Sequence, residues 1–172
     1  IVGLTGDMTN METMFAVKNL FQKILNSKYL DCRADHTYIN FEDRCNYLFN
    51  SNIEGIEESD FILLIGTNPR FEATILNSRI RKSYLKNKTQ IFSLEDVGDL
   101  TYPYTVLEND PKLIDQIIKN EHDLSNKISS AEKPIIILGQ SILKSKNGAY
   151  IFEEIKKYLT NINKITDNWN SL

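Results

Sequence analysis

Apolar and polar positions along the chain change period several times, and each change predicts a short strand followed by a helix. The clearest case is the all-apolar run Ile62–Ile65, which is typical of a strand buried on both faces. Gly66 can then turn the backbone sharply, while Asn68 suits a helix cap and Pro69 the first helical position. After this turn, apolar side chains recur at helical spacing: Phe71, Ile75, Leu76, Ile80 and Tyr84. The pattern predicts a strand, a turn and a helix of the parallel α/β type.

A similar strand and helix are predicted at the start of the chain. The strand covers Ile1–Leu4, and the helix runs from about Met11 to Leu25. Thr9 and Glu12 have the spacing of a capping box at the helix start. The expected buried stripe of the helix consists of Met14, Val17, Phe21, Ile24 and Leu25.

Two more strand-and-helix units are predicted in the second half. The strand Gln90–Leu94 precedes a helix that begins at Asp110 and Pro111, where the aspartate caps and the proline opens the helix. The strand Pro134–Gly139 precedes a helix near Gly148–Leu159. The side chains expected to face inward are Leu113, Ile114, Ile117 and Ile118 in the first helix, and Ile151, Phe152, Ile155 and Leu159 in the second.

The alternation of strands and helices favours a parallel sheet between two helix layers. We therefore predict an α/β fold with three layers, in which a mostly parallel, Rossmann-like sheet carries helices on both faces. The pattern leaves the strand order open. With 172 residues, 41% of them hydrophobic, the chain can bury one substantial core, so we expect a single domain over residues 1–172.

One long stretch, residues 28–59, mixes aromatic and polar side chains without a sustained period. A loop of this length is usually functional or packs against something outside its domain, so a partner surface is one interpretation. The alternative is an irregular helix near Tyr47–Phe49 with local excursions around it.

Charge and hydropathy exclude two classes of partner. The formal net charge of −3 argues against a nucleic-acid surface, which needs a clustered basic excess. The densest basic group, Arg79, Arg81 and Lys82, lies late on its predicted helix, where positive charge complements the helix dipole and has a structural role. Since no apolar run approaches the roughly 20 residues that cross a bilayer, we expect no direct membrane insertion.

The sequence offers little for metal or cluster chemistry. An iron–sulfur cluster needs about four thiolates, whereas this chain has 2 cysteines, Cys32 and Cys45, without a CxxC pair. Cys32, His36 and Cys45 could form a three-ligand zinc site, but they lack the tight spacing of known sites, so packing roles are favoured. No metal site is predicted.

No catalytic residue is predicted either. There is no GxSxG motif, and His122 is expected at a solvated helix start or loop. The acid pairs Glu57-Glu58 and Glu153-Glu154 point in different directions on a helix, which favours solvated roles. The segment Gly3–Gly6 could hold a phosphate at a helix start, but it lacks the remaining residues of a dinucleotide or P-loop motif, so a plain turn is favoured.

The turn after Ile65 belongs to a string that is much rarer than its α/β pattern, GTNPRFEA at residues 66–73 followed by NSRIRK at 77–82. This string resembles the large iron–sulfur subunit of respiratory NADH:ubiquinone oxidoreductase, complex I. The resemblance covers nearly the whole chain and identifies it as a piece of that subunit's C-terminal domain, which is related to molybdopterin oxidoreductases. Further segments that carry it are Arg44–Leu48, Ile53–Asp60, Asp99–Tyr102, Lys133–Ile135, Leu138-Gly139 and Asp167–Asn170.

The resemblance implies a cofactor site that has been lost. In active molybdopterin oxidoreductases, a turn like Gly66-Thr67-Asn68-Pro69 lies against the guanine-nucleotide end of the cofactor. Here Arg70–Ala73 fills the space after the turn with bulk and charge, and Glu95–Gly98 differs from the Asp-Pro-Arg type of ending in that family. We therefore expect a vestigial turn and no cofactor in this chain, with the iron–sulfur clusters in another domain or chain of the same subunit.

The implied function is architectural and non-catalytic: a part of the peripheral arm of complex I that supports electron transfer from NADH to ubiquinone. The implied partners are other peripheral-arm subunits, including the cluster-bearing part of the same subunit. The implied location is the matrix side of the mitochondrial inner membrane or, alternatively, the cytoplasmic side of a bacterial plasma membrane. Two other functions stay open, namely a nucleotide-binding pseudo-oxidoreductase module that retains the turn as a pocket, and an unrelated flavodoxin-like scaffold.

Overall fold

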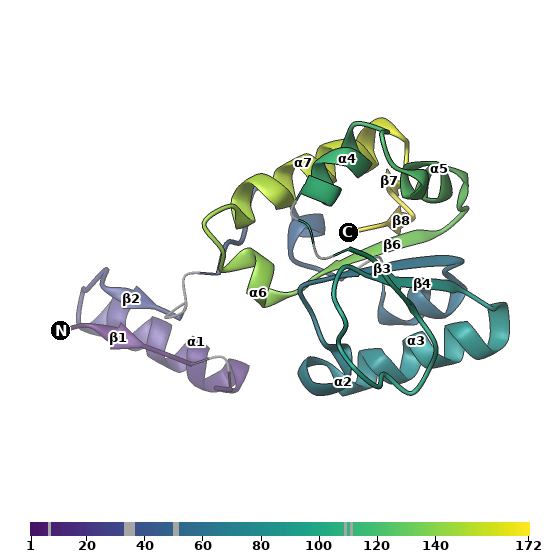
Figure 1. The fold of residues 1–172 in the computed structure, drawn as a ribbon. Coiled ribbons are helices and arrows are strands. Elements are labelled where there is room, and N and C mark those ends of the chain that lie inside the picture. The colour runs from purple at the N-terminus through teal and green to yellow at the C-terminus, as the bar shows by residue number, and fades with distance from the viewer. Residues whose placement is uncertain (7, 33–36, 50–51, 109, 111) are drawn as a thin grey trace. The chain divides into compact units, whose positions relative to one another are not determined.

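A computed structural model of the chain describes residues 1–6, 8–32, 37–49, 52–108, 110 and 112–172 (Figure 1). The chain divides into two compact units, Ile1–Thr37 and Tyr38–Leu172, called unit 1 and unit 2 below. The single domain expected over residues 1–172 stays a prediction. No helix among the described residues has both the length and the apolar character that a membrane span requires.

Unit 2 is built on a sheet of four parallel strands in the order β5-β4-β3-β6. In the central pairing, Leu63 lies opposite Phe92 on one side and Ile136 on the other. The parallel sheet was predicted, whereas its order and the short strand β5 were not. The strands are β3 (Phe61–Ile65), β4 (Gln90–Ser93), β5 (Thr105–Val106) and β6 (Pro134–Leu138).

The side chains of β3 divide between two hydrophobic cores, one on each face of the sheet. Phe61, Leu63 and Ile65 belong to one core, and Ile62 and Leu64 belong to the other. This division follows from strand geometry, because successive side chains point to opposite faces. A helix layer covers each core (Figure 1), which confirms the predicted three-layer α/β fold.

The first face is covered by α4 (Lys112–Ile118), α5 (Asp123–Ser130) and α7 (Gly148–Asn161). Asp110 Oδ1 accepts from Lys112 N at 2.9 Å, which confirms the predicted capping aspartate; Pro111 lies outside the described residues. Most of the predicted inward side chains are buried, while Ile118 and Ile151 are partly buried. The buried predicted set is Leu113, Ile114, Ile117, Phe152, Ile155 and Leu159.

The second face is covered by α3 (Thr74–Asn87) and the 3₁₀-helix η3 (Ile53–Glu58). The helix predicted after the turn is broken, because a first short helix, α2 (Pro69–Glu72), ends at Ala73. Ala73 leaves the helical region with φ −149° and ψ 68°, which changes the phase of the apolar stripe. Ile80 is therefore buried, but Phe71 and Ile75 are 81% and 68% exposed, so their place in the predicted stripe is wrong.

The last residues of unit 2 cover the outer edge of β6. After β6 come α6 (Gln140–Leu143) and α7, and then the antiparallel hairpin of β7 (Ile165–Thr166) and β8 (Trp169–Asn170). Ile136 N donates to Ser171 O at 2.7 Å. Trp169 Nε1 donates to Pro134 O at 3.1 Å. The segment after α7 thus packs along β6 on the side away from β3.

In unit 1, β1 (Gly3–Leu4) pairs in parallel with β2 (Leu30–Asp31), and β1 is not a strand of the four-stranded sheet. The helical segment consists of α1 (Met11–Asn19) and a π-helical turn, η1 (Leu20–Ile24). A sheet of two strands is narrow, so it offers little surface against which a helix can pack.

Two predictions for unit 1 are wrong. Asn10, not Thr9, caps α1, since Asn10 Oδ1 accepts from Thr13 N at 2.8 Å while Thr9 N donates to Gly6 O. Of the predicted buried stripe, only Phe21 is buried, Met14 and Val17 are half-buried, and Ile24 is 75% and Leu25 38% exposed. The π-helical turn changes the phase of the stripe after Asn19 and moves Ile24 away from the sheet.

The stretch at residues 28–59 contains β2, the 3₁₀ turn η2 (Arg44–Asn46) and η3; residues 33–36 and 50–51 lie outside the described part. The irregular helix predicted near Tyr47–Phe49 is therefore misplaced. Helical turns form instead where side chains cap them. Asp43 Oδ1 accepts from Cys45 N at 3.2 Å, and Asn52 Oδ1 accepts from Gly55 N at 2.7 Å.

Candidate functional site

The Gly66–Pro69 turn follows β3, the strand at which the chain changes direction across the sheet. From β3 the chain proceeds to β4 and β5 on one side, and it then returns to β6 on the other side. In open α/β sheets, ligands bind outside the carboxyl ends of the strands at such a switch point. The turn is therefore the place in this fold where a cofactor site has to be tested.

Asn68 organises the turn through both atoms of its amide. Its Oδ1 accepts from Arg70 N at 3.1 Å, and its Nδ2 donates to Val97 O, in the loop after β4, at 2.8 Å. Pro69 occupies the first turn of α2. The predicted cap and helix start are confirmed, and Asn68 also fixes the turn to the neighbouring loop.

Glu72 reaches back from α2 and fills the hydrogen-bonding positions of the turn. Thr67 Oγ1 donates to Glu72 Oε2 at 2.9 Å, and Asn68 N donates to Glu72 Oε1 at 3.2 Å. Free N–H groups at a helix start commonly bind a phosphate. In this turn an internal carboxylate already occupies that position, and its negative charge opposes the approach of an anion.

A second contact closes the switch point between the carboxyl ends of β3 and β6. Gly66 has φ +60°, and its carbonyl accepts a hydrogen bond from the Ser141 hydroxyl of α6. A Cβ on Gly139 would lie 1.9 Å from Gly66 O, and one on Gly66 would lie 2.3 Å from Ile142 Cγ1. The two loops are thus in direct contact, and protein atoms fill the space between them.

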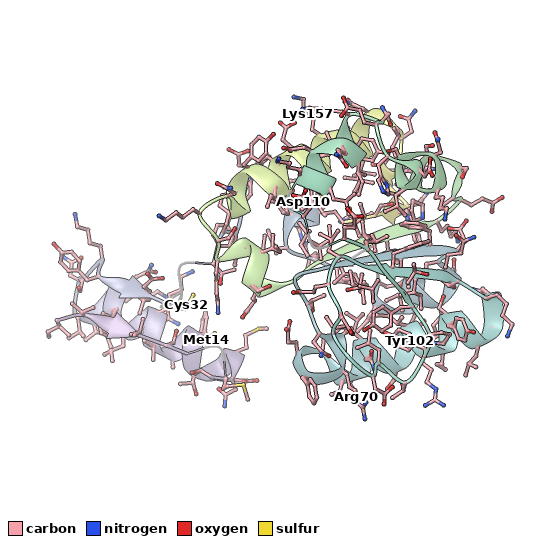
Figure 2. All side chains as sticks on the ribbon, in the orientation of Figure 1. Met14, Cys32, Arg70, Tyr102, Asp110 and Lys157 are labelled. Carbon is pink, nitrogen blue, oxygen red and sulfur yellow. The ribbon has the colours of Figure 1, made fainter. Side chains whose placement is uncertain are left out.

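The loop after β4 adds further carboxylates beside the turn. Arg70 Nη1 donates to Asp99 O and to Asp99 Oδ2, each at 2.6 Å. The Thr101 backbone N–H and Arg70 lower the pKa of Asp99, and the Gly98 backbone N–H lowers the pKa of Asp96. Because both carboxyl pKa values are lowered, the loop after β4 stays negatively charged at neutral pH. Arg70 and Tyr102 both lie on the α3 side of the sheet (Figure 2).

The turn does not fit the nucleotide end of a pterin cofactor as the structure arranges it. Such a group carries phosphates, which need free N–H donors or cations. The turn instead presents Glu72, and Arg70, the cation that follows it in sequence, is paired with Asp99. The sequence indicated that Arg70–Ala73 brings charge to the turn, but not that Glu72 accepts from Thr67 and Asn68. For the contact of Gly139 with Gly66, the only signal was that a glycine ends both apolar strand runs.

The cysteines and His36 do not form a metal site in the described part of the chain. Cys32 is exposed in unit 1, Cys45 is half-buried in unit 2, and His36 lies outside the described residues. Among the residues described, no three potential ligands from His, Cys, Asp and Glu come together. The packing role predicted for Cys32 is wrong, since its side chain faces solvent. Burial raises the pKa of the Cys45 thiol.

The remaining charged candidates have structural contacts. His122 caps α5, as its Nδ1 accepts from Leu124 N at 3.1 Å, so the predicted helix start is confirmed. Glu57 accepts from Arg79 at 2.6 Å and from Lys82 at 3.1 Å, which confirms a structural role for these two residues. Their predicted position late on the helix is wrong, since they lie in the middle of α3.

The acid pairs bind different partners, and two of their members, Glu57 and Glu154, are half-buried. Glu153 accepts from Tyr38 Oη at 2.7 Å and from Asn40 Nδ2 at 2.9 Å, and Glu57 is half-buried. Glu58 pairs with Lys133, and Glu154 lies 3.6 Å from Lys157. The solvated role predicted for both pairs holds for the exposed Glu58 and Glu153 and is wrong for the half-buried Glu57 and Glu154.

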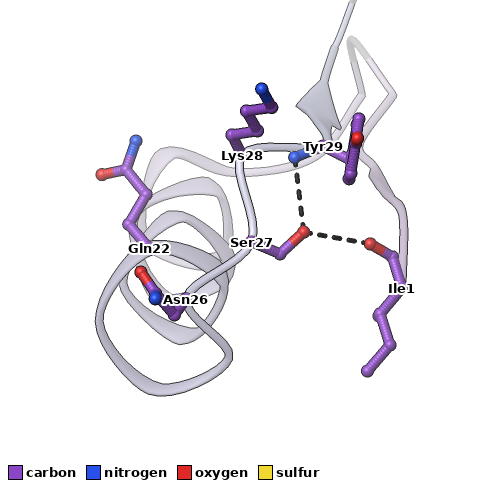
Figure 3. Close-up of a pocket in the computed structure, with 6 residues that line it drawn as sticks. All are labelled: Ile1, Gln22, Asn26, Ser27, Lys28 and Tyr29. Carbon is purple, nitrogen blue, oxygen red and sulfur yellow. Dashed lines mark hydrogen bonds between the residues drawn. The ribbon is translucent and has the colours of Figure 1, made fainter.

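Unit 1 contains a pocket of about 570 Å³, lined by Ile1, Gln22, Asn26, Ser27, Lys28 and Tyr29 (Figure 3). Ser27 Oγ lies between Ile1 O at 3.1 Å and Tyr29 N at 3.3 Å, so its hydroxyl is used within the chain. The Lys28 ammonium lies 5.9 Å from the centre of the Tyr29 ring. These contacts shape the pocket and place no nucleophile beside a base.

The Gly3–Gly6 segment supports the plain-turn interpretation. A Cβ on Gly3 would lie 2.7 Å from the Phe21 ring, so this glycine makes room for a core side chain. Gly6 O accepts from Thr9 N at 3.0 Å, which closes the turn before α1. Gly3 thus serves local packing, and Gly6 serves the turn.

A parallel sheet between two helix layers, with a Gly-Thr-Asn-Pro turn after its central strand, defines a Rossmann-like α/β protein. Within that class, the chain belongs to the molybdopterin oxidoreductase family, whose model matches residues 1–172. This membership excludes an unrelated flavodoxin-like scaffold.

The chain is also similar to large subunits of NADH–ubiquinone oxidoreductase, which confirms the resemblance inferred from the sequence. It is 36% identical over 99% of its length to the NADH-ubiquinone oxidoreductase 75 kDa subunit of Reclinomonas americana. It is 30% identical over its full length to the mitochondrial NADH dehydrogenase (ubiquinone) iron-sulfur protein 1 of Solanum tuberosum. It is 33% identical over 98% of its length to the mitochondrial 78 kDa subunit of Candida albicans.

The chain spans only about a quarter of the length of these relatives, namely 26%, 23% and 24%. Most of each relative therefore lies outside the region that this chain matches.

Proposed function

We propose that the chain is an architectural, non-catalytic part of the large iron–sulfur subunit in the peripheral arm of complex I. There it would support electron transfer from NADH to ubiquinone that other parts of the complex carry out. Similarity along the whole chain to NADH–ubiquinone oxidoreductase subunits supports the assignment to that complex. The observation that supports a non-catalytic role is the Glu72 carboxylate, which occupies the helix start of the Gly66–Pro69 turn.

We also propose that this chain itself binds no cofactor. At the switch point, the Gly66–Gly139 contact fills space, and Glu72 supplies negative charge where a nucleotide would need positive charge. The iron–sulfur clusters would lie in another domain or chain of the same subunit, because a cluster needs about four thiolates and this chain has 2 cysteines. The turn is then vestigial, a retained structural element without its ligand.

Partners and location follow from the same assignment. The partners would be other subunits of the peripheral arm and the cluster-bearing part of the same subunit. Two of the similar proteins are named as mitochondrial, which favours the matrix side of the inner membrane over the cytoplasmic side of a bacterial plasma membrane.

Substitutions in the turn test whether its role is structural. Asn68→Val removes both amide contacts, and Pro69→Gly loosens the start of α2, each at a cost of about 1–2 kcal/mol. The amount of assembled complex I should fall, while NADH oxidation per assembled complex stays unchanged. Both are measured by native gel electrophoresis and activity staining, with the exposed Asn126→Val on α5 as a control. Normal assembly with lost NADH oxidation would show that the turn is a working site.

Ligand analysis separates the proposal from the nucleotide-binding alternative. The purified chain should contain no stoichiometric iron, molybdenum or flavin, as measured by elemental analysis and absorbance spectra. Guanine and adenine nucleotides should leave its melting temperature unchanged, whereas a ligand at 100 times its Kd would stabilise it by about 2.7 kcal/mol. A saturable shift that Glu72→Gln enlarges would favour a retained nucleotide pocket instead.

A further inference from the structure

A cavity of about 200 Å³ lies in unit 2 between the segment around η2 and the end of β6. Cys45–Phe49 forms one wall, and Ile136–Leu138 forms another. Leu143, Phe152 and Leu172 complete the lining, so most of the surrounding side chains are apolar. This cavity is separate from the Gly66–Pro69 turn and was not indicated by any sequence motif.

Asn46 contributes an unusual polar group to this lining. Its Oδ1 accepts from Lys156 Nζ at 2.5 Å and from Cys45 Sγ at 3.6 Å, which fixes the orientation of the amide. Its Nδ2 is buried, and among the residues that the structure describes it has no hydrogen-bond partner. Buried amide donors almost always have an acceptor in native proteins. The Asn46 amide can therefore donate to an acceptor oxygen that lies outside the described residues.

The rim of the cavity is apolar and exposed. Tyr47 is 48% exposed and Leu48 is 43% exposed, and both also line the cavity. The Phe41 ring, 61% exposed, lies 6.0 Å from the Tyr47 ring between centroids. Aromatic side chains around an apolar depression are typical of protein–protein contact surfaces, in which one inserted side chain provides much of the affinity.

We propose that this cavity receives one apolar side chain from a segment of the same large subunit outside residues 1–172. A backbone carbonyl of that segment would accept from Asn46 Nδ2. The volume is below the roughly 300–1,000 Å³ of small-molecule sites, which favours a single side chain over a ligand. The inference rests on the proposed function. Since about three quarters of each relative lies outside the matched region, the same subunit offers the largest supply of such segments.

Photo-crosslinking identifies the occupant directly. Tyr47 is replaced by benzoylphenylalanine in the full-length large subunit, the complex is assembled and irradiated, and crosslinked peptides are identified by mass spectrometry. We expect a peptide of the same subunit from outside residues 1–172. A crosslink only to another subunit, only within residues 1–172, or none at all would overturn the proposal. The same replacement at Tyr150, 57% exposed on α7, is the control and should not capture that peptide.

A second variant tests the role of the Asn46 amide. Asn46→Asp keeps the oxygen that accepts from Lys156 but replaces the N–H donor with a second acceptor, which repels a carbonyl. The crosslinking yield from position 47 should fall at least tenfold, while circular dichroism stays unchanged. Asn126→Asp, an exposed site on α5, should leave the yield unchanged. An equal yield from the Asn46→Asp protein would show that no acceptor binds there.

Separate measurements test the cavity's occupant and the proposed function. Native gel electrophoresis of the tagged full-length subunit shows whether it assembles into complex I, and this tests the function alone. The crosslink is also measured in the free full-length subunit, where a contact within the same polypeptide persists without the complex. A subunit that crosslinks as expected but fails to enter complex I would retain this inference and refute the function.

Discussion

The two units contain the same sequence pattern but differ in what they bury. In each, a short apolar strand leads through a glycine-containing turn to a helix capped by an asparagine, Asn10 in unit 1 and Asn68 in unit 2. In unit 2, β3 pairs with a strand on both sides, and all five of its residues are buried. In unit 1, β1 pairs with β2, and Phe21 is the buried large apolar side chain among the described residues.

This difference shows that local sequence selects the element, while its neighbours determine how much it buries. In α1, which is described throughout, no side chain is buried, and Met11 and Phe15 are 81% and 66% exposed. A sheet of two strands is marginal by itself, whereas four strands between helix layers can support an independent core. The stability of the chain should therefore reside in unit 2.

Hydrogen exchange should show the largest difference between the units. Amides of β3 and β6 should exchange only through global unfolding, with a free energy typically of about 5–15 kcal/mol. Amides of α1 should exchange through local opening at a small fraction of that free energy, because its side chains are not buried. Exchange followed by mass spectrometry measures both in one sample. Equal protection of α1 and β3 would break the comparison.

Truncating equivalent leucines should produce the next largest effect. Leu64 of β3 is fully buried, so Leu64→Ala should lower the free energy of unfolding by about 2–5 kcal/mol. Leu4 of β1 is 64% exposed, and Leu4→Ala should change it by less than about 0.5 kcal/mol. Urea titration of both variants provides the measurement. A large loss from Leu4→Ala would mean that unit 1 contributes a core of its own.

Glycine substitutions sharpen the comparison at the two turns. A Cβ on Gly139 would overlap the Gly66 backbone, so Gly139→Ala should destabilise unit 2 by about 1–3 kcal/mol. Among the described residues, a Cβ on Gly6 would meet no heavy atom within 4 Å, so Gly6→Ala should change stability by less than about 0.5 kcal/mol. Melting curves should show a shift of about 2–4 °C per kcal/mol for a chain of this size. A Gly139→Ala protein that melts like the parent would refute the tight contact.

The smallest effect concerns acid titration of Glu57 in unit 2. The hydrogen bonds from Lys82 and Arg79 hold the pKa of Glu57 below its ordinary value of 4.5. Its stabilising contribution is therefore fully present above pH 4.5 and is lost as the pH falls through the lower folded-state pKa. Glu57→Gln should reduce this loss, which unfolding curves between pH 3 and 6, about the range of carboxylate titration, can detect. If the free energy of unfolding depended on pH in the same way in the variant and the parent, Glu57 would not contribute to the acid sensitivity.

The sequence predicted best those elements whose signal is local and strong. The apolar run Ile62–Ile65, the cap at Asn68 and the inward stripe of α7 all follow from residues within one element. The strand β5 has two residues, Thr105 and Val106, which are too few for a detectable period. The helix break at Ala73 could not be predicted, because no glycine or proline stands at that position.

The candidate site was predicted only in part, since its decisive contacts join distant segments. The turn was located, and its cap was assigned correctly. The contact of Gly66 with Gly139 joins positions 73 residues apart and depends on the pairing of β3 with β6, which periodicity cannot give. Glu72 is closer in sequence, but its return to Thr67 depends on the short helix α2.

The bond between Ile136 N and Ser171 O has a consequence for self-association. An exposed strand edge is a template for pairing with other chains, and Pro134–Leu138 is a run of β-prone apolar residues. On the outer side of this run, Ile136 N donates to Ser171 O, and at its start Pro134 O accepts from Trp169 Nε1. These backbone groups are therefore not available to another chain. The opposite edge of the sheet, β5, has only two residues with which to pair. The four-stranded sheet is thereby protected at both margins from growing into intermolecular β-aggregates.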